Sequence, residues 1–114
     1  HYTTLKEVED ALAAARAAGK PAIVDFYASW CTDCVRMEKT TLRDARVRKA
    51  LAGHVLIQAD VTETNQQTLA IKKRLRVLGP PAMLFFGADG QEIQAARFYG
   101  YRKADEFLAL LAGL

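Results

Sequence analysis

Two cysteines three positions apart, between an apolar run and a helix-compatible segment, constrain the fold of this chain more than any other feature. The run from Ala22 to Tyr27 leads into Trp30-Cys31-Thr32-Asp33-Cys34, and the 114 residues contain no other cysteine. A disulfide within this motif would close a loop too short to restrict the unfolded chain much. The pair therefore favours chemistry over structural cross-linking, and it requires a strand and a helix that meet at the cysteines.

A Cys-X-X-Cys pair at the start of a helix is typical of a redox site. The first cysteine would lie at the N-terminal end of the helix, where unpaired N–H groups and the helix dipole favour a thiolate. Cys31 is thus the predicted attacking thiol and Cys34 the resolving thiol. Two alternatives stay open: the pair binds zinc, for which only His1 and His54 remain as soft ligands, or it is an inert buried pair.

Apolar spacing, capping residues and turn residues predict alternating helices and strands. Helices are expected at about 5–18, from the cysteines to 39 or 40, after a cap at Asp44, after a capping box of Thr64 and Gln67, and at about 103–111. Strands are expected at 22–27, 55–61 and 82–86, and 92–99 should return antiparallel after a turn at 87–90. This order predicts one α/β domain, with a mixed sheet that has helices on both faces.

Apolar residues that recur at helical spacing should face the core. In the helix after the capping box, the residues predicted to face inward or nearly so are Leu69, Ile71 and Leu75. In the last helix, the residues predicted to share one face are Ala104, Phe107, Leu108 and Leu111.

The composition limits the classes of partner. The formal charge is +3 and the basic residues cluster at 43–49 and 72–76, but no aromatic residues interleave with them. We therefore expect solvated helix faces and no nucleic acid, although phosphate contact stays an alternative. The longest apolar runs are far shorter than the roughly 20 residues of a membrane helix, so no membrane insertion is expected. Because the chain begins at His1 without a methionine, we expect a mature form or a domain of a longer protein.

Two carboxylates are predicted to lie near the cysteines. Asp25 interrupts the apolar strand, where an ionised group would be costly, and Glu38 would share a helix face with Cys31 and Cys34. A carboxylate about 6 Å from a thiolate disfavours it by roughly 2–3 kcal/mol at an effective dielectric constant of about 20. The helix terminus returns only about 0.3–2 kcal/mol. The carboxylates, with Asp33 beside them, thus favour a pair that gives electrons. The alternatives are an Asp25 that is a satisfied polar group or forms a salt bridge, and a Glu38 on the helix surface.

Trp30, Pro80 and Pro81 are the predicted docking residues. An exposed aromatic residue beside a thiol is a good docking surface, although Trp30 could also be a core residue. A proline before the third strand can adopt the cis form, with a trans turn as the alternative. Whether Tyr99 and Tyr101 lie near the site or pack in the core stays open.

Several blocks of sequence resemble the thioredoxin superfamily over nearly the whole chain. They are Val24 to Cys31, Glu38 to Thr41, Gln58 to Thr62, Val77 to Pro81 and Leu84 to Phe86. The set is most similar to the C-terminal periplasmic domain of inner-membrane thiol:disulfide interchange proteins. The resemblance implies a thioredoxin fold, Cys31 and Cys34 as the redox pair, Asp25 and Glu38 as acidic residues that raise the thiol pKa, and Pro81 as a cis-proline.

The same resemblance implies partners and a location. The domain would be periplasmic and would form mixed disulfides with the transmembrane domain and the N-terminal periplasmic domain of one transporter, as a monomer and without a bound cofactor. Pro80 departs from the superfamily pattern because it lacks the N–H that would pair with a bound peptide. The alternatives are a free-standing thioredoxin-like reductase of the envelope or cytosol, and a small metal-binding or protein-interaction module.

Overall fold

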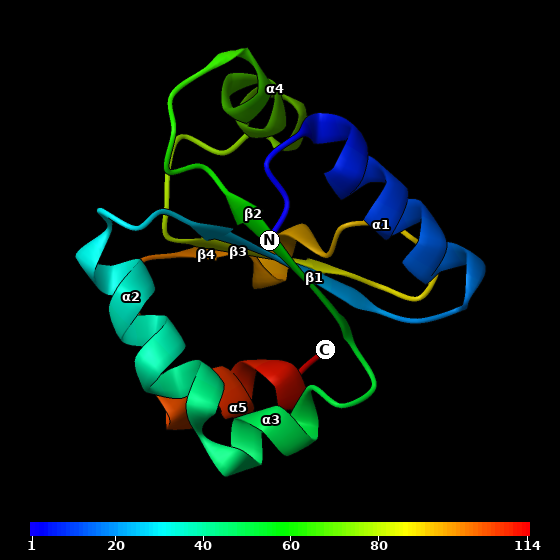
Figure 1. Ribbon diagram of the computed structural model, residues 1–114. Coiled ribbons are helices and arrows are strands. Elements are labelled where there is room, and N and C mark those ends of the chain that lie inside the picture. The colour runs from blue at the N-terminus through cyan, green and yellow to red at the C-terminus, as the bar shows by residue number, and fades with distance from the viewer.

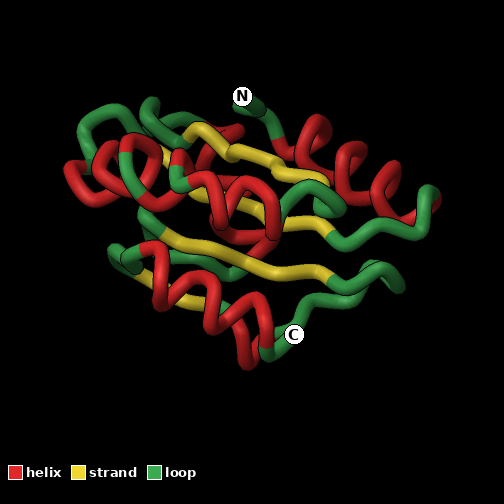
Figure 2. The backbone as a smooth tube through the Cα atoms, turned by 90° about the horizontal axis from the view of Figure 1, so that it is seen from below, coloured by secondary structure: helices red, strands yellow, loops and turns green.

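The computed structural model describes residues 1–114 as a four-stranded sheet between two groups of helices (Figures 1 and 2). The helices are α1 (Leu5–Ala17), α2 (Thr32–Lys39), α3 (Ala45–Ala50), α4 (Gln66–Leu75) and α5 (Ala104–Ala112), with short 3-10 helices at Thr41–Arg43 and Gln94–Ala96. The strands are β1 (Ala22–Tyr27), β2 (Val55–Asp60), β3 (Ala82–Phe86) and β4 (Phe98–Tyr99). The predicted α/β class with a mixed sheet is confirmed.

The sheet has the order β2-β1-β3-β4, in which β1 is parallel to β2 and antiparallel to β3. This register decides which loops meet. Phe26, near the end of β1, pairs with Ala82 at the start of β3, and Ala82 also pairs with Tyr99 at the end of β4. The segments that follow β1, β2 and β4 therefore meet the segment that precedes β3 at one end of the sheet.

Alternation along β1 supplies both faces of the sheet with core residues. Val24 and Phe26 belong to the larger core cluster, which α1 and α4 cover, whereas Ile23 belongs to a second cluster with Met37 of α2 and Phe107 of α5. All of these side chains are buried. Asp25 lies on the same face as Ile23, so its carboxyl group points toward the α2 side of the sheet.

The start of α4 differs from the prediction. Asn65 caps the helix and forms a reciprocal capping box with Thr68, so the predicted box of Thr64 and Gln67 is wrong. Ile71 is buried as predicted, but Leu69 is exposed. Residues two positions apart lie on nearly opposite sides of a helix, so both could not face the core.

The segment predicted to return as a strand over 92–99 is interrupted. Glu92 forms a single bridge with Phe86, a 3-10 helix follows, and only Phe98–Tyr99 pairs with β3. The guanidinium of Arg97 donates to both carboxylate oxygens of Glu92, at 2.7 and 2.8 Å. This pair closes the segment into a loop that an extended strand could not form.

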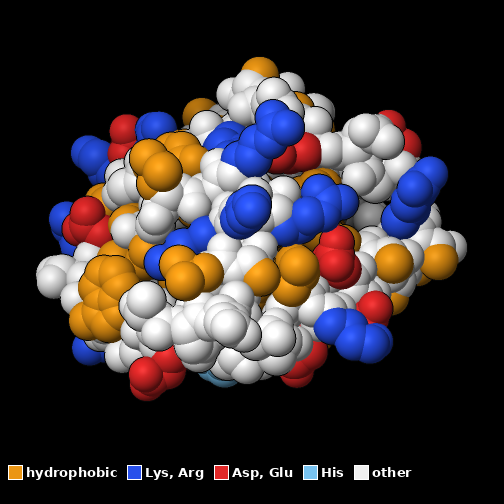
Figure 3. All heavy atoms as spheres, turned by 90° about the horizontal axis from the view of Figure 1, so that it is seen from above, with side chains coloured by type: hydrophobic (Ala, Val, Ile, Leu, Met, Phe, Trp, Pro, Cys, Tyr) orange, Lys and Arg blue, Asp and Glu red, His pale blue; other side chains and the backbone are white.

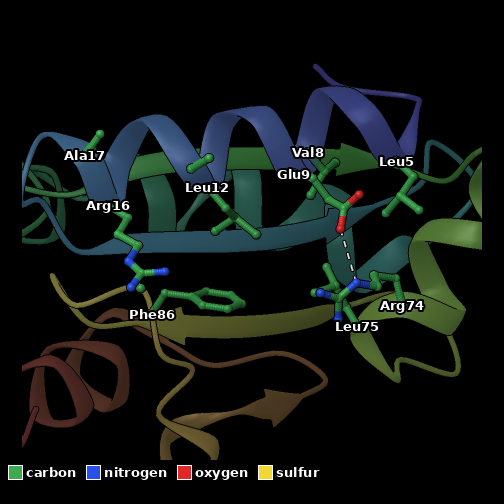
Figure 4. A pocket seen from close by; sticks show the side chains of 11 residues that line it. Leu5, Val8, Glu9, Leu12, Arg16, Ala17, Arg74, Leu75 and Phe86 are labelled. Carbon is green, nitrogen blue, oxygen red and sulfur yellow. Dashed lines mark hydrogen bonds and ion pairs between the residues drawn. The ribbon is translucent and has the colours of Figure 1, made fainter.

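The outer surface carries charges and one groove. Lys and Arg side chains gather over the face seen from above (Figure 3). Lys73 and Arg74 of α4 and its C-cap residue Arg76 are exposed. A groove of about 550 Å³ lies between α1 and α4, with Phe86 below it and the ion pair of Glu9 and Arg74 across it (Figure 4). None of the helices combines the length and the apolar character needed to cross a bilayer.

Candidate functional site

Cys31 and Cys34 form a disulfide at the N-terminus of α2. Cys31 is the N-cap residue, its sulfur accepts a hydrogen bond from the backbone N–H of Cys34 at 3.2 Å, and the two Cα atoms lie 5.2 Å apart. Both residues are buried, with 7% and 4% of their surface exposed. The sequence therefore placed the pair at the correct junction. The N–H contact is one that would stabilise a thiolate at Cys31.

Trp30 lies beside the disulfide with 60% of its surface exposed, so it is not a core residue. Its indole N–H donates to the carbonyl oxygen of Thr62 at 2.9 Å. The neighbouring Ser29 N–H donates to the Thr62 hydroxyl, also at 2.9 Å. Sequence reasoning missed Thr62. Parallel β1 and β2 end at the same edge, and this relation was the available signal that the two following loops would touch.

Asp25 and Glu38 line one cavity of about 310 Å³ on the α2 side of the sheet, together with Gln58, Arg43 and Arg48. The two carboxylates therefore lie on the same side of the sheet, around one cavity. Asp25 is 7% exposed and forms no salt bridge, which leaves the salt-bridged alternative without support. Glu38 is half-buried and not a plain surface residue, whereas Asp33 is exposed.

Burial raises the pKa of Asp25 from 3.8 to about 7. The charge of Glu38 contributes to this rise in pKa, and the hydrogen bond with the side chain of Gln58, its cross-strand neighbour, opposes it. At neutral pH Asp25 therefore exchanges readily between its protonated and ionised forms. Asp25 directly precedes Phe26, whose carbonyl oxygen lies 3.8 Å from the sulfur of Cys34. A buried group at this position is suited to proton transfer and to controlling the charge of the site.

The peptide bond between Pro80 and Pro81 is cis, and both prolines are half-exposed. The carbonyl of Pro81 accepts a hydrogen bond from Gly100 at 3.1 Å, which joins the segment before β3 to the turn after β4. Leu78, two residues before Pro80, is 96% exposed. Figure 1 shows this segment at the same end of the sheet as the start of α2.

The two tyrosines that flank Gly100 differ in environment. Tyr99 is 48% exposed, whereas Tyr101 packs under the guanidinium of Arg36 at 3.9 Å and lies 3.1 Å from the Thr40 hydroxyl. The hydrogen bond with Thr40 lowers the pKa of Tyr101. Tyr101 thus braces the far end of α2, while Tyr99 stays available at the surface.

The structure gathers no group of three or more His, Cys, Asp or Glu side chains in a metal-binding arrangement. His1 packs edge-on against Tyr27, and His54 is half-buried at the start of β2. Neither histidine therefore completes a ligand set with the cysteines.

The family model described as a thioredoxin-like domain matches residues 8–114. The chain belongs to this family. Among curated proteins it is 47% identical over 108 residues to the thiol:disulfide interchange protein DsbD of Ralstonia nicotianae and 45% identical over 112 residues to that of Escherichia coli K12. These matches cover 95% and 97% of the chain but only 18% and 20% of the relatives, so it spans about a fifth of their length.

Solved structures agree with this assignment. The DsbD C-terminal domain of Neisseria meningitidis matches in its oxidised form with a TM-score of 0.79 at 28% identity, and in its reduced form with 0.85 at 27%. Each match covers 99% of this chain and 98% of the other. The thioredoxin-like fold, the disulfide at the start of α2 and the similarity to DsbD together support a thiol-disulfide oxidoreductase.

Proposed function

We propose that this thioredoxin-like domain accepts electrons from the transmembrane domain of an inner-membrane protein and passes them to a periplasmic partner domain of the same protein. The observation that carries the proposal is the disulfide at the N-terminus of α2, in a fold similar to both the oxidised and the reduced DsbD C-terminal domain. The domain would act as a monomer, with the cysteine pair itself as the electron carrier and no bound cofactor.

The electrons enter by two exchange steps. A thiolate of the donor attacks the sulfur of Cys31, which forms a mixed disulfide and releases Cys34 as a thiolate. A second donor thiolate then attacks the donor sulfur of the mixed disulfide and releases Cys31. The donor leaves with a disulfide, and the domain holds two electrons as a dithiol.

The electrons leave by the reverse order of events. Cys31 as thiolate attacks the partner disulfide, which forms a mixed disulfide and releases one partner thiolate. Cys34 then attacks the sulfur of Cys31 and releases the second. Two electrons and two protons have moved to the partner, and the Cys31–Cys34 bond is restored. Cys34 lies about one turn inside α2 and is slightly more buried than the N-cap residue Cys31, so Cys31 is the sulfur that partners reach.

The direction of flow follows from the carboxylates on the α2 side of the sheet. A pair is strongly oxidising when its thiolate is well stabilised. When Asp25 and Glu38 are ionised, their charges oppose a thiolate and work against the contribution of the helix terminus. The pair should then give electrons more readily than it takes them, and neutral Asp25 should relieve the opposition when a partner covers the site.

A redox titration with thiol trapping tests the general proposal. A reversible two-electron couple supports it, and a metal-binding or interaction module would show none. Titration of the thiolate absorbance tests the direction: a Cys31 pKa well below 7 would contradict the donor role.

The partner assignment needs a trap. In a Cys34→Ser variant the second exchange cannot occur, so the mixed disulfide between Cys31 and the partner domain should accumulate and be visible by mass spectrometry. A Cys31→Ser variant is the matched control and should trap nothing. Transmembrane spans with their own cysteine pair, encoded upstream of His1, would support the transporter, whereas a start codon or a bare signal peptide there would favour a free-standing reductase.

A further inference from the structure

The segment that carries Trp30 is attached to the loop after β2 through a single residue. The backbone N–H of Ser29 donates to the Thr62 hydroxyl, and the indole N–H of Trp30 donates to the Thr62 carbonyl, both at 2.9 Å. Ser29 and Trp30 are both exposed, so core packing does not hold them. Thr62 therefore accepts the two hydrogen bonds that anchor Ser29 and Trp30, directly before Cys31.

Thr62 is itself fixed by Asp60, the last residue of β2. One carboxylate oxygen of Asp60 accepts from the Thr62 N–H at 2.9 Å and from the Thr62 hydroxyl at 2.6 Å. Because the hydroxyl proton goes to Asp60, a lone pair of the same oxygen is free to accept from Ser29. The charge of the Asp60 carboxylate makes the hydrogen bond from the Thr62 hydroxyl short and strong. The Thr62 hydroxyl thus serves both partners through one oxygen atom.

We propose that Thr62, oriented by Asp60, is a positioning residue that holds Trp30 in place for docking of protein disulfides. The inference rests on the function proposed above. The indole N–H is already paired, so the face of the ring is what a partner contacts. Because the position of the ring is fixed in advance, little conformational entropy is lost when a partner binds. Thr62 acts through Trp30 and not on the sulfur chemistry, so small disulfides should not sense it.

The test compares Thr62→Val with Thr64→Val, a matched substitution at an exposed residue of the same loop that makes no side-chain hydrogen bond. The assays are reduction of insulin, as a protein disulfide, and of dithiobis(nitrobenzoic acid), as a small one. We expect T62V to raise KM for insulin by about threefold to tenfold, the equivalent of one net hydrogen bond, with kcat and the small-disulfide rate unchanged. T64V should behave as the native chain.

Trp30 is the only tryptophan, so intrinsic fluorescence reports on this residue alone. T62V should lower its fluorescence anisotropy, and Thr62→Ser, which keeps the hydroxyl, should restore both anisotropy and KM. T62V removes the hydroxyl that anchors Ser29 and keeps the carbonyl that accepts from the indole, so its effect reaches Trp30 through the neighbouring residue. In a Trp30→Ala background, which lacks the ring, T62V should therefore have no further effect on KM. If T62V does not fold, Asp60→Asn replaces it in both measurements. KM for insulin should then rise and the fluorescence anisotropy should fall, each by less than is expected for T62V.

The outcomes separate the two proposals. Native KM and native anisotropy in T62V overturn the positioning role, and so does an equal loss of rate with insulin and with the small disulfide, since that would place the effect at the sulfurs. If the native chain reduces neither reagent, the proposed function fails instead, and the anisotropy of T62V still decides whether Thr62 holds Trp30.

Discussion

Two regions of the molecule are opposite in character. Trp30, Leu78 and Pro80 belong to loops at the end of the sheet where α2 begins, and we call them the exposed face because these apolar and aromatic groups lie at the surface. Asp25 and Glu38 line a cavity on the α2 side of the sheet, which we call the carboxylate cavity. The exposed face can recognise a partner, whereas the carboxylate cavity can set the charge that the sulfurs experience.

Partner recognition and control of the thiol pKa therefore depend on different residues. The exposed face depends on loops held by hydrogen bonds and one ion pair, through Thr62 and Arg97. The carboxylate cavity depends on burial within strand β1, which raises the pKa of Asp25 to about 7. Substitutions on one side should therefore leave the property of the other side largely intact.

The largest effect should come from Asp25→Asn. Because the pKa of Asp25 is raised from 3.8 to about 7, the folded chain binds more protons than the unfolded chain between these values. The free energy of unfolding should thus fall as the pH rises from about 4 to 7, and then level off. The variant should lack this fall and be more stable than the native chain above pH 7, by up to about 4 kcal/mol at 1.36 kcal/mol for each unit of pKa.

Urea denaturation of the oxidised chain at several pH values measures this difference. Asp33→Asn, at an exposed carboxylate on the first turn of α2, is the control and should keep the native pH profile. D25N should also lower the pKa of the Cys31 thiol, while KM for insulin should change little. A variant that tracks the native stability curve at every pH would show that burial of Asp25 carries no such cost.

How far the sequence predicted this molecule depends on the range of the interactions. Strands 22–27 and 82–86 agree with the structure because continuous apolar runs specify buried strands locally. The shared location of Asp25 and Glu38 followed from a strand and a helix that adjoin in the chain. The contacts of Thr62 were not predicted because its partners, Trp30 and Ser29, are 32 and 33 residues away, and no local pattern marks such a contact.

The errors have a similar cause. The segment 92–99 has the residue types of a strand, but the ion pair between Glu92 and Arg97 bends it, and side-chain pairing of that kind is not visible in a propensity. The apolar pattern of the helix grouped Leu69 with Ile71 and Leu75 as residues that face inward or nearly so. Its exposure follows from the helix phase that Thr68 and Ile71 set when both are buried.

A smaller effect is expected from Arg97→Ala, which should disturb the exposed face without touching the carboxylate cavity. Arg97 is only 16% exposed, and beyond Glu92 it donates to the carbonyls of Leu75 and Arg76, each at 2.8 Å. These carbonyls end α4 directly before the segment with the cis-proline. Removal leaves Glu92 half-buried and unpaired, and the free energy of unfolding should fall by about 2–3 kcal/mol.

Arg74→Ala is the matched control because it removes an arginine from a solvent-exposed ion pair, with Glu9. Such pairs contribute about 1 kcal/mol or less. Denaturation of both variants gives the comparison, and hydrogen exchange at Val77, whose N–H bonds to Lys72 at 2.8 Å, reports on the segment itself. Equal losses in R97A and R74A would mean that the Glu92–Arg97 pair does not brace this side of the site.

The smallest effect should come from Leu78→Ser, which tests whether the exposed face binds partners at all. Leu78 contributes almost nothing to the fold because 96% of its surface is exposed, so stability should change by less than about 0.5 kcal/mol. If a protein disulfide covers this side chain on docking, its loss should cost about 1 kcal/mol, or about a fivefold rise in KM for insulin.

Leu114→Ser is the control for Leu78→Ser. Leu114 is 48% exposed and lines a hollow with Pro21 and Gly87, at the opposite end of the sheet. Since the thiol pKa and the rate with a small disulfide depend on the carboxylate cavity, both should stay native in L78S. A shift in either would mean that the two regions are coupled.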